Sequence, residues 1–234
     1  IYALSASMCC RTSDLFKYHH YNPISMFHYW YRSLKTEKSN RRELEVMQRN
    51  KYYMGRTEWD KNIVKYYSLN SQYFHCEEAI RPEILHSDRK WKFVQHKKMR
   101  IVTISGASAL KGNGLILRTA KILKELGFDF EWRVAGNKNS FNLFESMIGL
   151  KHDKLNIRLL GFVDANEVVN ELCEADVYVH TAIIDNSPNS LCEAQLIGCP
   201  VIATNIGGIP QLVDNGRTIM NFSFVSPKDI EKLN

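Results

Sequence analysis

DNSPNSLCEAQLIGCPVIATNIGG, which spans residues 185–208, is the stretch that decides the fold of this chain. Pro188 ends any helix that arrives from the preceding loop, and Asn189 and Ser190 are residue types that favour the N-cap of a new helix. An apolar run at 200–203 and a Gly-Gly turn follow. We therefore expect a loop, a helix that begins near residue 190 and a buried strand.

The same alternation of strand and helix extends back to residue 101. Short apolar runs, typical of strands covered on both faces, occur at 101–104, 132–135, 156–160, 177–180 and 200–203. Helical stretches separate them near 112–126, 140–149, 165–174 and 190–197. This pattern predicts an α/β fold with a doubly wound parallel sheet and right-handed crossovers.

The loops that contain Lys111 and Asp185 are the expected binding region, because open parallel sheets bind ligands at the carboxyl ends of their strands. The helix after Asp185 directs free backbone N–H groups and its positive dipole end at the loop, which suits an anion. Glu193, one turn into that helix, and Asp185 can both accept hydrogen bonds from hydroxyl groups. A ligand with phosphate at one end and hydroxyls at the other is a nucleotide sugar.

Four segments of the chain carry a family resemblance. They are 101–106 (IVTISG), 159–163 (LLGFV), 175–179 (ADVYV) and 193–204 (EAQLIGCPVIAT). Lys111-Gly112 follows the first segment, and Gly207-Gly208 follows the last. In this order they resemble the donor-binding domain of the retaining glycosyltransferases of family 4, which have the GT-B fold. The resemblance covers about residues 101–216. It extends with fewer matches over 49–85, where 55–60 and 73–77 resemble the last amino-domain elements of some bacterial members.

The resemblance implies a role for each candidate residue. Asp185 would bind hydroxyls of the transferred sugar, Glu193 would bind the ribose hydroxyls, and Lys111 would neutralise the leaving diphosphate. These three are the expected catalytic residues. With them, the expected donor-binding set comprises Gly106, Asn186, Ser187, Asn189, Ser190 and Leu191, the backbone N–H groups of 187–191 included. The family needs no metal and no cofactor beyond its substrate, and no Asp-x-Asp pair stands at a strand end.

Three positions depart from the family pattern. Asp185 replaces the family's first Glu and is one methylene shorter, and Gln211 replaces the Glu after Gly-Gly. An Arg that the family often places near the lysine is missing from 106–110, which would leave Lys111 as the cation on the diphosphate.

Each assignment also has a simpler structural alternative. The run 190–193 (SLCE) matches a capping box, in which the Glu side chain reaches back to the Ser backbone N–H. Asp185 is a residue type that begins turns, and Lys111 could be a surface lysine at a helix start. His180, at the end of a predicted strand, is either a packing residue or a donor contact.

The first hundred residues predict fewer elements. We expect a helix at 28–50, strands at 52–55 and 72–76, a helix at 58–67 and a linker at 86–100. Together with the resemblance, this gives residues 1–90 as the carboxy-terminal part of an incomplete, Rossmann-like acceptor domain with its linker. Residues 91–234 would be the donor domain, truncated at its end. We therefore expect a fragment that is inactive alone and lacks the start of its amino-terminal domain.

Charge is unevenly shared along the chain. Residues 1–100 carry 19 Lys and Arg against 10 Asp and Glu, whereas residues 101–234 carry 12 against 15. No nucleic-acid-binding motif accompanies the basic part, so we expect no nucleic acid partner. A basic solvated face is the simplest interpretation, and peripheral contact with an anionic membrane or a lipid-linked acceptor is the alternative.

Cysteine spacing and hydropathy bear on the compartment. None of the six cysteines forms a C-x-x-C pair, and no apolar run approaches the roughly 20 residues that span a bilayer. Reduced thiols in a cytoplasmic protein, with membrane association at most peripheral, are therefore expected.

The sequence thus predicts a glycosyltransferase that moves a sugar from a nucleotide-diphosphate sugar to a glycan or lipid-linked acceptor, with retention. The resemblance suggests bacterial surface polysaccharide synthesis. A non-catalytic nucleotide-sugar-binding homologue is the alternative that Asp185 and the missing Arg favour. A Rossmann oxidoreductase is disfavoured, because no G-x-G-x-x-G follows a strand with an acid about 20 residues on.

Overall fold

The computed structural model describes residues 38–77, 79–106, 109–213 and 219–222. The chain divides into two compact units, one ending at Glu77 and the other beginning at Glu78.

The first unit contains a parallel βαβ element. A helix at 38–49 precedes β1 (Tyr52–Gly55), α4 (Glu58–Tyr67) and β2 (Gln72–His75), and the two strands pair in parallel. A capping box between Thr57 and Asp60 begins α4, because each side chain accepts the other residue's backbone N–H. The strands and helix predicted here are confirmed. Of the predicted helix at 28–50, residues 28–37 lie outside the described residues.

The second unit is built on one parallel sheet. Its strands are β3 (Met99–Ser105), β4 (Phe130–Gly136), β5 (Ile157–Gly161), β6 (Val177–His180), β7 (Val201–Thr204) and β8 (Ile219–Phe222). Its α-helices are α5 (Pro82–Leu85), α6 (Asn113–Glu125), α7 (Lys138–Ile148), α8 (Ala165–Cys173), α9 (Asn189–Ile197) and α10 (Ile209–Leu212). Two 3₁₀ turns, η1 (Ala109–Lys111) and η2 (His152–Leu155), complete it. All five strands and all four helices predicted after residue 100 are present, whereas α5, α10, β8 and both 3₁₀ turns were not predicted.

The strand order is β5-β4-β3-β6-β7-β8, and every neighbouring pair is parallel. The chain therefore winds outward from β3 in one direction and then returns to build β6, β7 and β8 on the other side of β3. This doubly wound order confirms the predicted fold class. It also places the topological switch point between the carboxyl ends of β3 and β6, where such sheets bind ligands.

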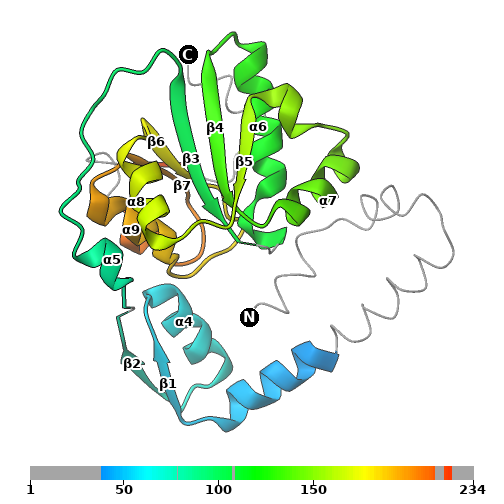
Figure 1. The fold of residues 1–234 in the computed structure, drawn as a ribbon. Helices are drawn as coiled ribbons and strands as arrows, with labels where there is room; N and C mark the ends of the chain where they lie inside the picture. Colours follow the sequence, from blue (N-terminus) through cyan, green and yellow to red (C-terminus); the bar gives the residue numbers. More distant parts are fainter. Residues whose placement is uncertain (1–37, 78, 107–108, 214–218, 223–234) are drawn as a thin grey trace, which may run out of the picture. The chain divides into compact units, whose positions relative to one another are not determined.

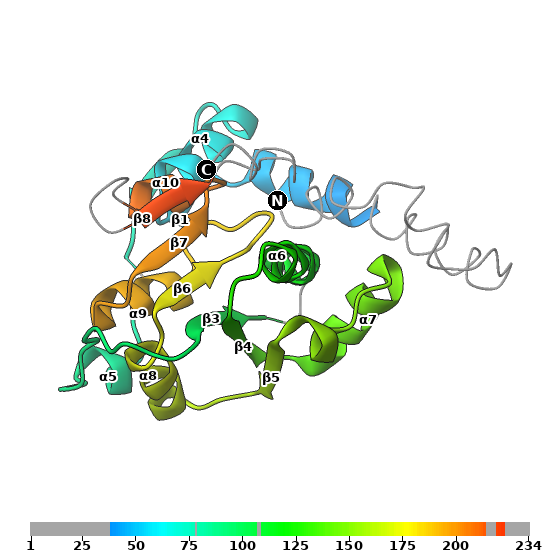
Figure 2. The ribbon, with the colours of Figure 1, turned by 90° about the horizontal axis from the view of Figure 1, so that it is seen from above.

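Helices cover both faces of this sheet, with α6 and α7 on one side and α5, α8 and α9 on the other (Figure 1). Each side has its own apolar core. One is centred on Phe130, Trp132 and Phe141 under α6 and α7, and the other on Leu172, Leu191 and Ile197 of α8 and α9. The view from above shows the same separation of the helices by the sheet (Figure 2).

Residues 79–98 run along the second unit before β3 begins. Ile84 of α5 is fully buried in the core beneath α8 and α9. The backbone N–H of Trp91 donates to the Ile197 carbonyl, and its indole N–H donates to the Ala175 carbonyl at 2.6 Å. Of the linker predicted at 86–100, residues 86–98 contain no helix or strand, and residues 99–100 belong to β3. The linker residues are attached to the second unit by these contacts.

Candidate functional site

Asp185 is the centre of a charged cluster at the switch point. Lys111 Nζ lies 2.5 Å from Asp185 Oδ2, and His180 Nε2 lies 3.3 Å from the same oxygen. The backbone N–H of Asn186 donates to the other carboxylate oxygen at 3.1 Å. The Asp185 side chain is only 6% exposed. The structure therefore brings together the lysine loop and the acid loop that the sequence singled out.

These contacts keep Asp185 ionised. Burial alone would raise the pKa of the Asp185 carboxyl group, but the interactions with His180 and Lys111 together outweigh burial and hold that pKa below its ordinary value. His180 Nε2 lies within ion-pair distance of the carboxylate but makes no hydrogen bond. Asp185 consequently carries a negative charge, and its side-chain neighbours come from the end of β6 and from η1.

Backbone contacts fix the two loops against each other. The Thr181 hydroxyl donates to the Lys111 carbonyl at 3.0 Å, and the Ile183 N–H donates to the Leu110 carbonyl at 2.7 Å. Gly112 separates Lys111 from α6 with φ +77°, and a Cβ there would lie 1.7 Å from the Thr181 carbonyl oxygen. Only glycine allows this approach, so Gly112 is what lets Lys111 reach Asp185.

The Gly-Gly turn supports the same loop from the far side. Gly207 has φ +56°, and a Cβ on it would lie 1.9 Å from the Asp185 carbonyl oxygen. The N–H of Gly208 donates to that oxygen at 3.1 Å. The turn that the sequence placed after the last strand therefore anchors the backbone of the acid itself.

The first turn of α9 faces this cluster, but it begins differently from the prediction. Pro188 is the N-cap, with no side-chain hydrogen bond, whereas the sequence favoured Asn189 or Ser190. Pro188 fits because its ring fixes φ at −72° and because N-cap side chains are optional when the loop backbone is already held. Ser190 instead accepts a hydrogen bond from the Tyr178 hydroxyl at 2.9 Å.

The other expected donor-binding residues of the loop and of the first turn of α9 differ in their burial and in their backbone hydrogen bonds. Asn186 and Ser187 are half-buried between Asp185 and Pro188. Leu191 is fully buried, and its N–H already donates to the Pro188 carbonyl. As N1 and N2 of α9, Asn189 and Ser190 have backbone N–H groups with no helical acceptor.

Glu193 faces a partner that the sequence analysis missed. Arg81 Nε and Nη2 donate to the two carboxylate oxygens of Glu193, both at 2.8 Å, in a bidentate pair. The Glu193 side chain is 3% exposed. The capping-box interpretation of residues 190–193 is therefore wrong, because α9 has no side-chain cap and the carboxylate turns to Arg81 instead. No local signal marked Arg81, which lies 112 residues away in sequence.

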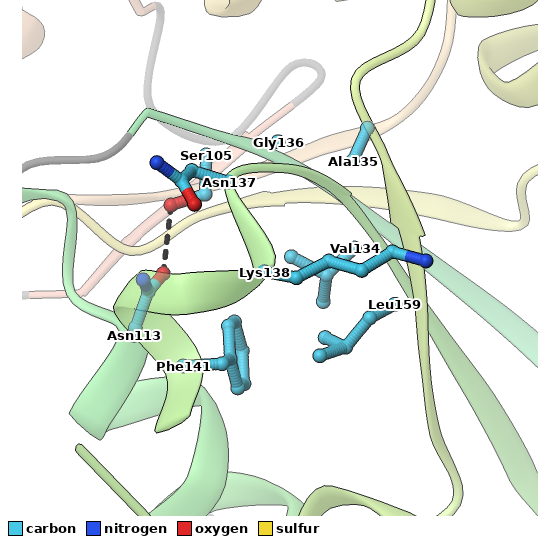
Figure 3. A pocket seen from close by; sticks show the side chains of 9 residues that line it. All are labelled: Ser105, Asn113, Val134, Ala135, Gly136, Asn137, Lys138, Phe141 and Leu159. Carbon is cyan, nitrogen blue, oxygen red and sulfur yellow. Dashed lines mark hydrogen bonds between the residues drawn. The ribbon is translucent and has the colours of Figure 1, made fainter. Parts of the chain in front are cut away.

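Gly106 is exposed directly after β3, and a Cβ on it would lie 3.6 Å from Lys111 Cγ. Beside it, at the carboxyl ends of β3, β4 and β5, is a shallow surface depression. Figure 3 shows its lining, with the Ser105 hydroxyl bonded to Asn113 Oδ1 at 2.7 Å and the Lys138 amino nitrogen pointing away from that pair. Asn137 also lines it. The sequence analysis did not single out these polar residues, although Asn137 and Lys138 directly follow β4.

No helix in the described part of the chain is both long and apolar enough to cross a membrane. No group of three or more His, Cys, Asp or Glu side chains among those residues is arranged to hold a metal ion. The described cysteines, Cys76, Cys173, Cys192 and Cys199, are free thiols, and Cys9 and Cys10 lie outside the described residues.

Comparison with known proteins agrees with this geometry. The family profile described as "Glycosyl transferases group 1" matches residues 98–234, which contain the whole Lys111–Asp185 cluster. The chain belongs to this glycosyltransferase family. Its matched region includes every candidate donor-site residue that the sequence analysis named.

Two curated relatives are similar over about half of the chain. The phosphatidylinositol N-acetylglucosaminyltransferase GPI3 subunit of Saccharomyces cerevisiae is 30% identical over 122 residues, which is 52% of this chain and 27% of the relative. The amylovoran biosynthesis glycosyltransferase AmsK of Erwinia amylovora is 26% identical over 143 residues, or 58% of this chain and 35% of the relative. The chain thus matches about a third or less of the length of these relatives.

Similarity to a solved structure extends over more of the chain. Sucrose-phosphate synthase from Thermosynechococcus elongatus has a TM-score of 0.64 over 82% of this chain and 49% of its own, at 14% identity. That likeness supports the fold, which is of the GT-B type.

Proposed function

We propose that the protein containing this chain transfers a sugar from a nucleotide-diphosphate sugar to a glycan or lipid-linked acceptor, with retention of the anomeric configuration. The observation that carries the proposal is the Lys111–Asp185 pair, 2.5 Å apart at the switch point of the sheet beside the first turn of α9. A cation, an acid and a helix N-terminus are the groups that a ligand with both phosphate and hydroxyls requires.

The pair suggests how the donor enters the site. In the structure, Lys111 and Asp185 neutralise each other. On binding, the diphosphate would take over the Lys111 ammonium group, and the sugar hydroxyls would donate to the Asp185 carboxylate that Lys111 releases. One internal ion pair is thereby exchanged for two contacts with the donor. The free N–H groups of Asn189 and Ser190 would add hydrogen bonds to its anionic end.

Lys111 would contribute most as the glycosidic bond breaks, because negative charge then builds on the leaving diphosphate. The family resemblance implies front-face attack, in which the leaving phosphate takes the proton of the acceptor hydroxyl. This mechanism uses no enzyme nucleophile. We assign no metal and no cofactor beyond the sugar donor.

The relatives' names support the acceptor class. AmsK is named for amylovoran biosynthesis, and the name of the GPI3 subunit includes phosphatidylinositol, a lipid. We therefore propose bacterial surface polysaccharide synthesis in the cytoplasm, with peripheral membrane contact through the basic residues that precede β3. Domain limits at 1–90 for the acceptor part and 91–234 for the donor part belong to the same proposal.

The test is a screen of the full-length protein against UDP- and GDP-sugars with candidate acceptors, read by mass spectrometry. We expect one donor to add a sugar mass to an acceptor, and Lys111→Met to lower turnover about 100-fold. Lys121→Met is the matched control, because Lys121 is an exposed residue of α6 that pairs only with Glu125 at 3.5 Å. Proton NMR of the product reports the anomeric configuration.

A non-catalytic nucleotide-sugar-binding homologue is the second candidate. The observation that favours this candidate is that the Asp185 and Glu193 side chains are both buried, and that each is already paired with a cation of the protein itself, Lys111 or Arg81. Donor binding in calorimetry without turnover on any acceptor would establish this candidate. Absence of both binding and turnover would refute both functions.

A further inference from the structure

His180 is a buried titratable side chain that the proposed sugar transfer does not use. It is the last residue of β6, and its side chain is 3% exposed. Its Nε2 lies 3.3 Å from Asp185 Oδ2, yet this nitrogen has no hydrogen-bond partner in the described part of the chain. A lone pair on Nε2 would face the negative carboxylate, so Nε2 carries a proton. The structure thus holds a buried N–H group beside Asp185 that is not engaged.

Contacts with the core hold the imidazole ring of His180 from its other nitrogen. The Tyr178 hydroxyl lies 3.3 Å from His180 Nδ1. The same hydroxyl is bonded to Ser190 Oγ, in the first turn of α9, at 2.9 Å. Because Tyr178 is fully buried, this chain of contacts fixes the ring between α9 and Asp185. A change at Asp185, and not a movement of the ring, is therefore what would engage Nε2.

The present partners of Asp185 explain why Nε2 is not engaged. Lys111 Nζ lies 2.5 Å from Oδ2, the oxygen that His180 faces, and the Asn186 N–H donates to Oδ1 at 3.1 Å. If the donor diphosphate draws Lys111 away, the Asn186 N–H is the remaining hydrogen-bond donor to this carboxylate among the described residues. The side chain is 6% exposed, so water cannot replace the lost cation, and a buried charge without a partner is strongly disfavoured.

We propose, on the basis of the proposed function, that His180 is a positioning residue that takes over Asp185 when the donor diphosphate takes over Lys111. A small rotation of the carboxylate lets Oδ2 accept the Nε2–H bond. A carboxylate has about four lone-pair sites, so the bonds from Asn186 and His180 leave sites for sugar hydroxyls. His180 thereby lowers the free-energy cost of releasing Lys111, although it touches neither the nucleotide nor the sugar.

The experiment uses the full-length protein and measures its affinity for UDP and GDP by titration calorimetry. His180→Phe keeps a ring and removes both nitrogens, and we expect it to weaken binding of the preferred nucleotide about tenfold. His180→Gln places an amide N–H near the position of Nε2 and should restore most of the loss. His180→Asn reaches only the position of Nδ1 and should not restore it. In the Asp185→Asn background Lys111 has no carboxylate to leave, so His180→Phe should have no further effect.

His96→Phe is the matched control, because His96 Nδ1 is bonded to Asp176 at 3.1 Å, at the opposite end of β6. Its nucleotide affinity should equal that of the unchanged protein.

An unchanged nucleotide affinity in His180→Phe overturns the proposal. Equal losses in His180→Gln and His180→Asn also overturn it, since a purely structural role of the ring would give them, and this comparison decides if His180→Phe does not fold. A full further loss in the Asp185→Asn background has the same consequence. Failure of the unchanged protein to bind either nucleotide refutes the proposed function together with this proposal. Normal binding by the unchanged protein and by its His180 variants refutes this proposal alone.

Discussion

Replacing Asp185 with Asn removes one negative charge from the centre of the site and keeps the shape of the side chain. In the structure this carboxylate faces Lys111 at 2.5 Å and His180 at 3.3 Å, with 6% of the side chain exposed. Asn cannot neutralise the ammonium group of Lys111, so the substitution leaves a cation in the cluster without its counter-ion.

The cost follows from the burial of both partners. Breaking a fully buried ion pair by removing one partner costs about 3–5 kcal/mol. Lys111 keeps 25% of its side chain exposed, so water can solvate part of its charge, and the expected loss falls to about 2 kcal/mol. For a chain of this size that corresponds to a decrease in melting temperature of about 4–8 °C.

The assay is urea unfolding of both proteins as a function of pH. Because the folded-state pKa of Asp185 is lowered, its charge stabilises the fold above the unfolded-state pKa of about 3.9. That contribution is lost as the pH falls through the folded-state pKa. The difference in unfolding free energy should therefore be constant above about pH 5 and shrink below about pH 4.

Asp153→Asn is the control, since Asp153 is exposed on η2, and its effect should stay within about 0.5 kcal/mol. A difference below about 0.5 kcal/mol for Asp185→Asn at pH 7 would refute the reasoning. So would a difference that does not change on acidification.

Two further predictions concern the loop and the thiols. In urea unfolding, Gly112→Ala should destabilise the protein by about 3 kcal/mol or more, whereas Gly127→Ala should cost about 1 kcal/mol. Both glycines have φ near +80°, but only at position 112 would the added Cβ meet a backbone atom. Equal losses in the two variants would contradict this. At pH 8, iodoacetamide should label exposed Cys76 and leave Cys199 unlabelled until denaturant is added, as mass spectrometry can show. The Cys199 residue is 4% exposed, and its burial is the main cause that raises the pKa of its thiol to about 12. Labelling of Cys199 in the folded protein would therefore disprove its burial.

Local signals in the sequence were sufficient for the sheet and the loops. Buried strands and amphipathic helices repeat at spacings that neighbouring residues alone define, so β3 to β7 and α6 to α9 were predicted within a few residues. The alternation of strands and helices predicted a doubly wound parallel sheet but not the order of its strands. The prediction placed the loops of Lys111 and Asp185 at the carboxyl ends of strands, and the observed strand order brings these loops together at the switch point.

The tertiary structure decided which side chains Asp185 and Glu193 face. Residues 86–100 had the composition of a linker, and no local pattern marked Arg81 just before them. Buried Ile84 and the bonds of Lys90, Trp91 and His96 attach this part of the chain to the second unit. Glu193 had an available local partner in Ser190, but a bidentate bond to a guanidinium group is stronger than a bond to a single backbone N–H. Ion pairing of this kind depends on packing between residues far apart in sequence, which no local pattern encodes. The sequence by itself therefore determined the sheet and the loops that carry Lys111 and Asp185, and packing determined which charged groups lie beside Asp185 and Glu193.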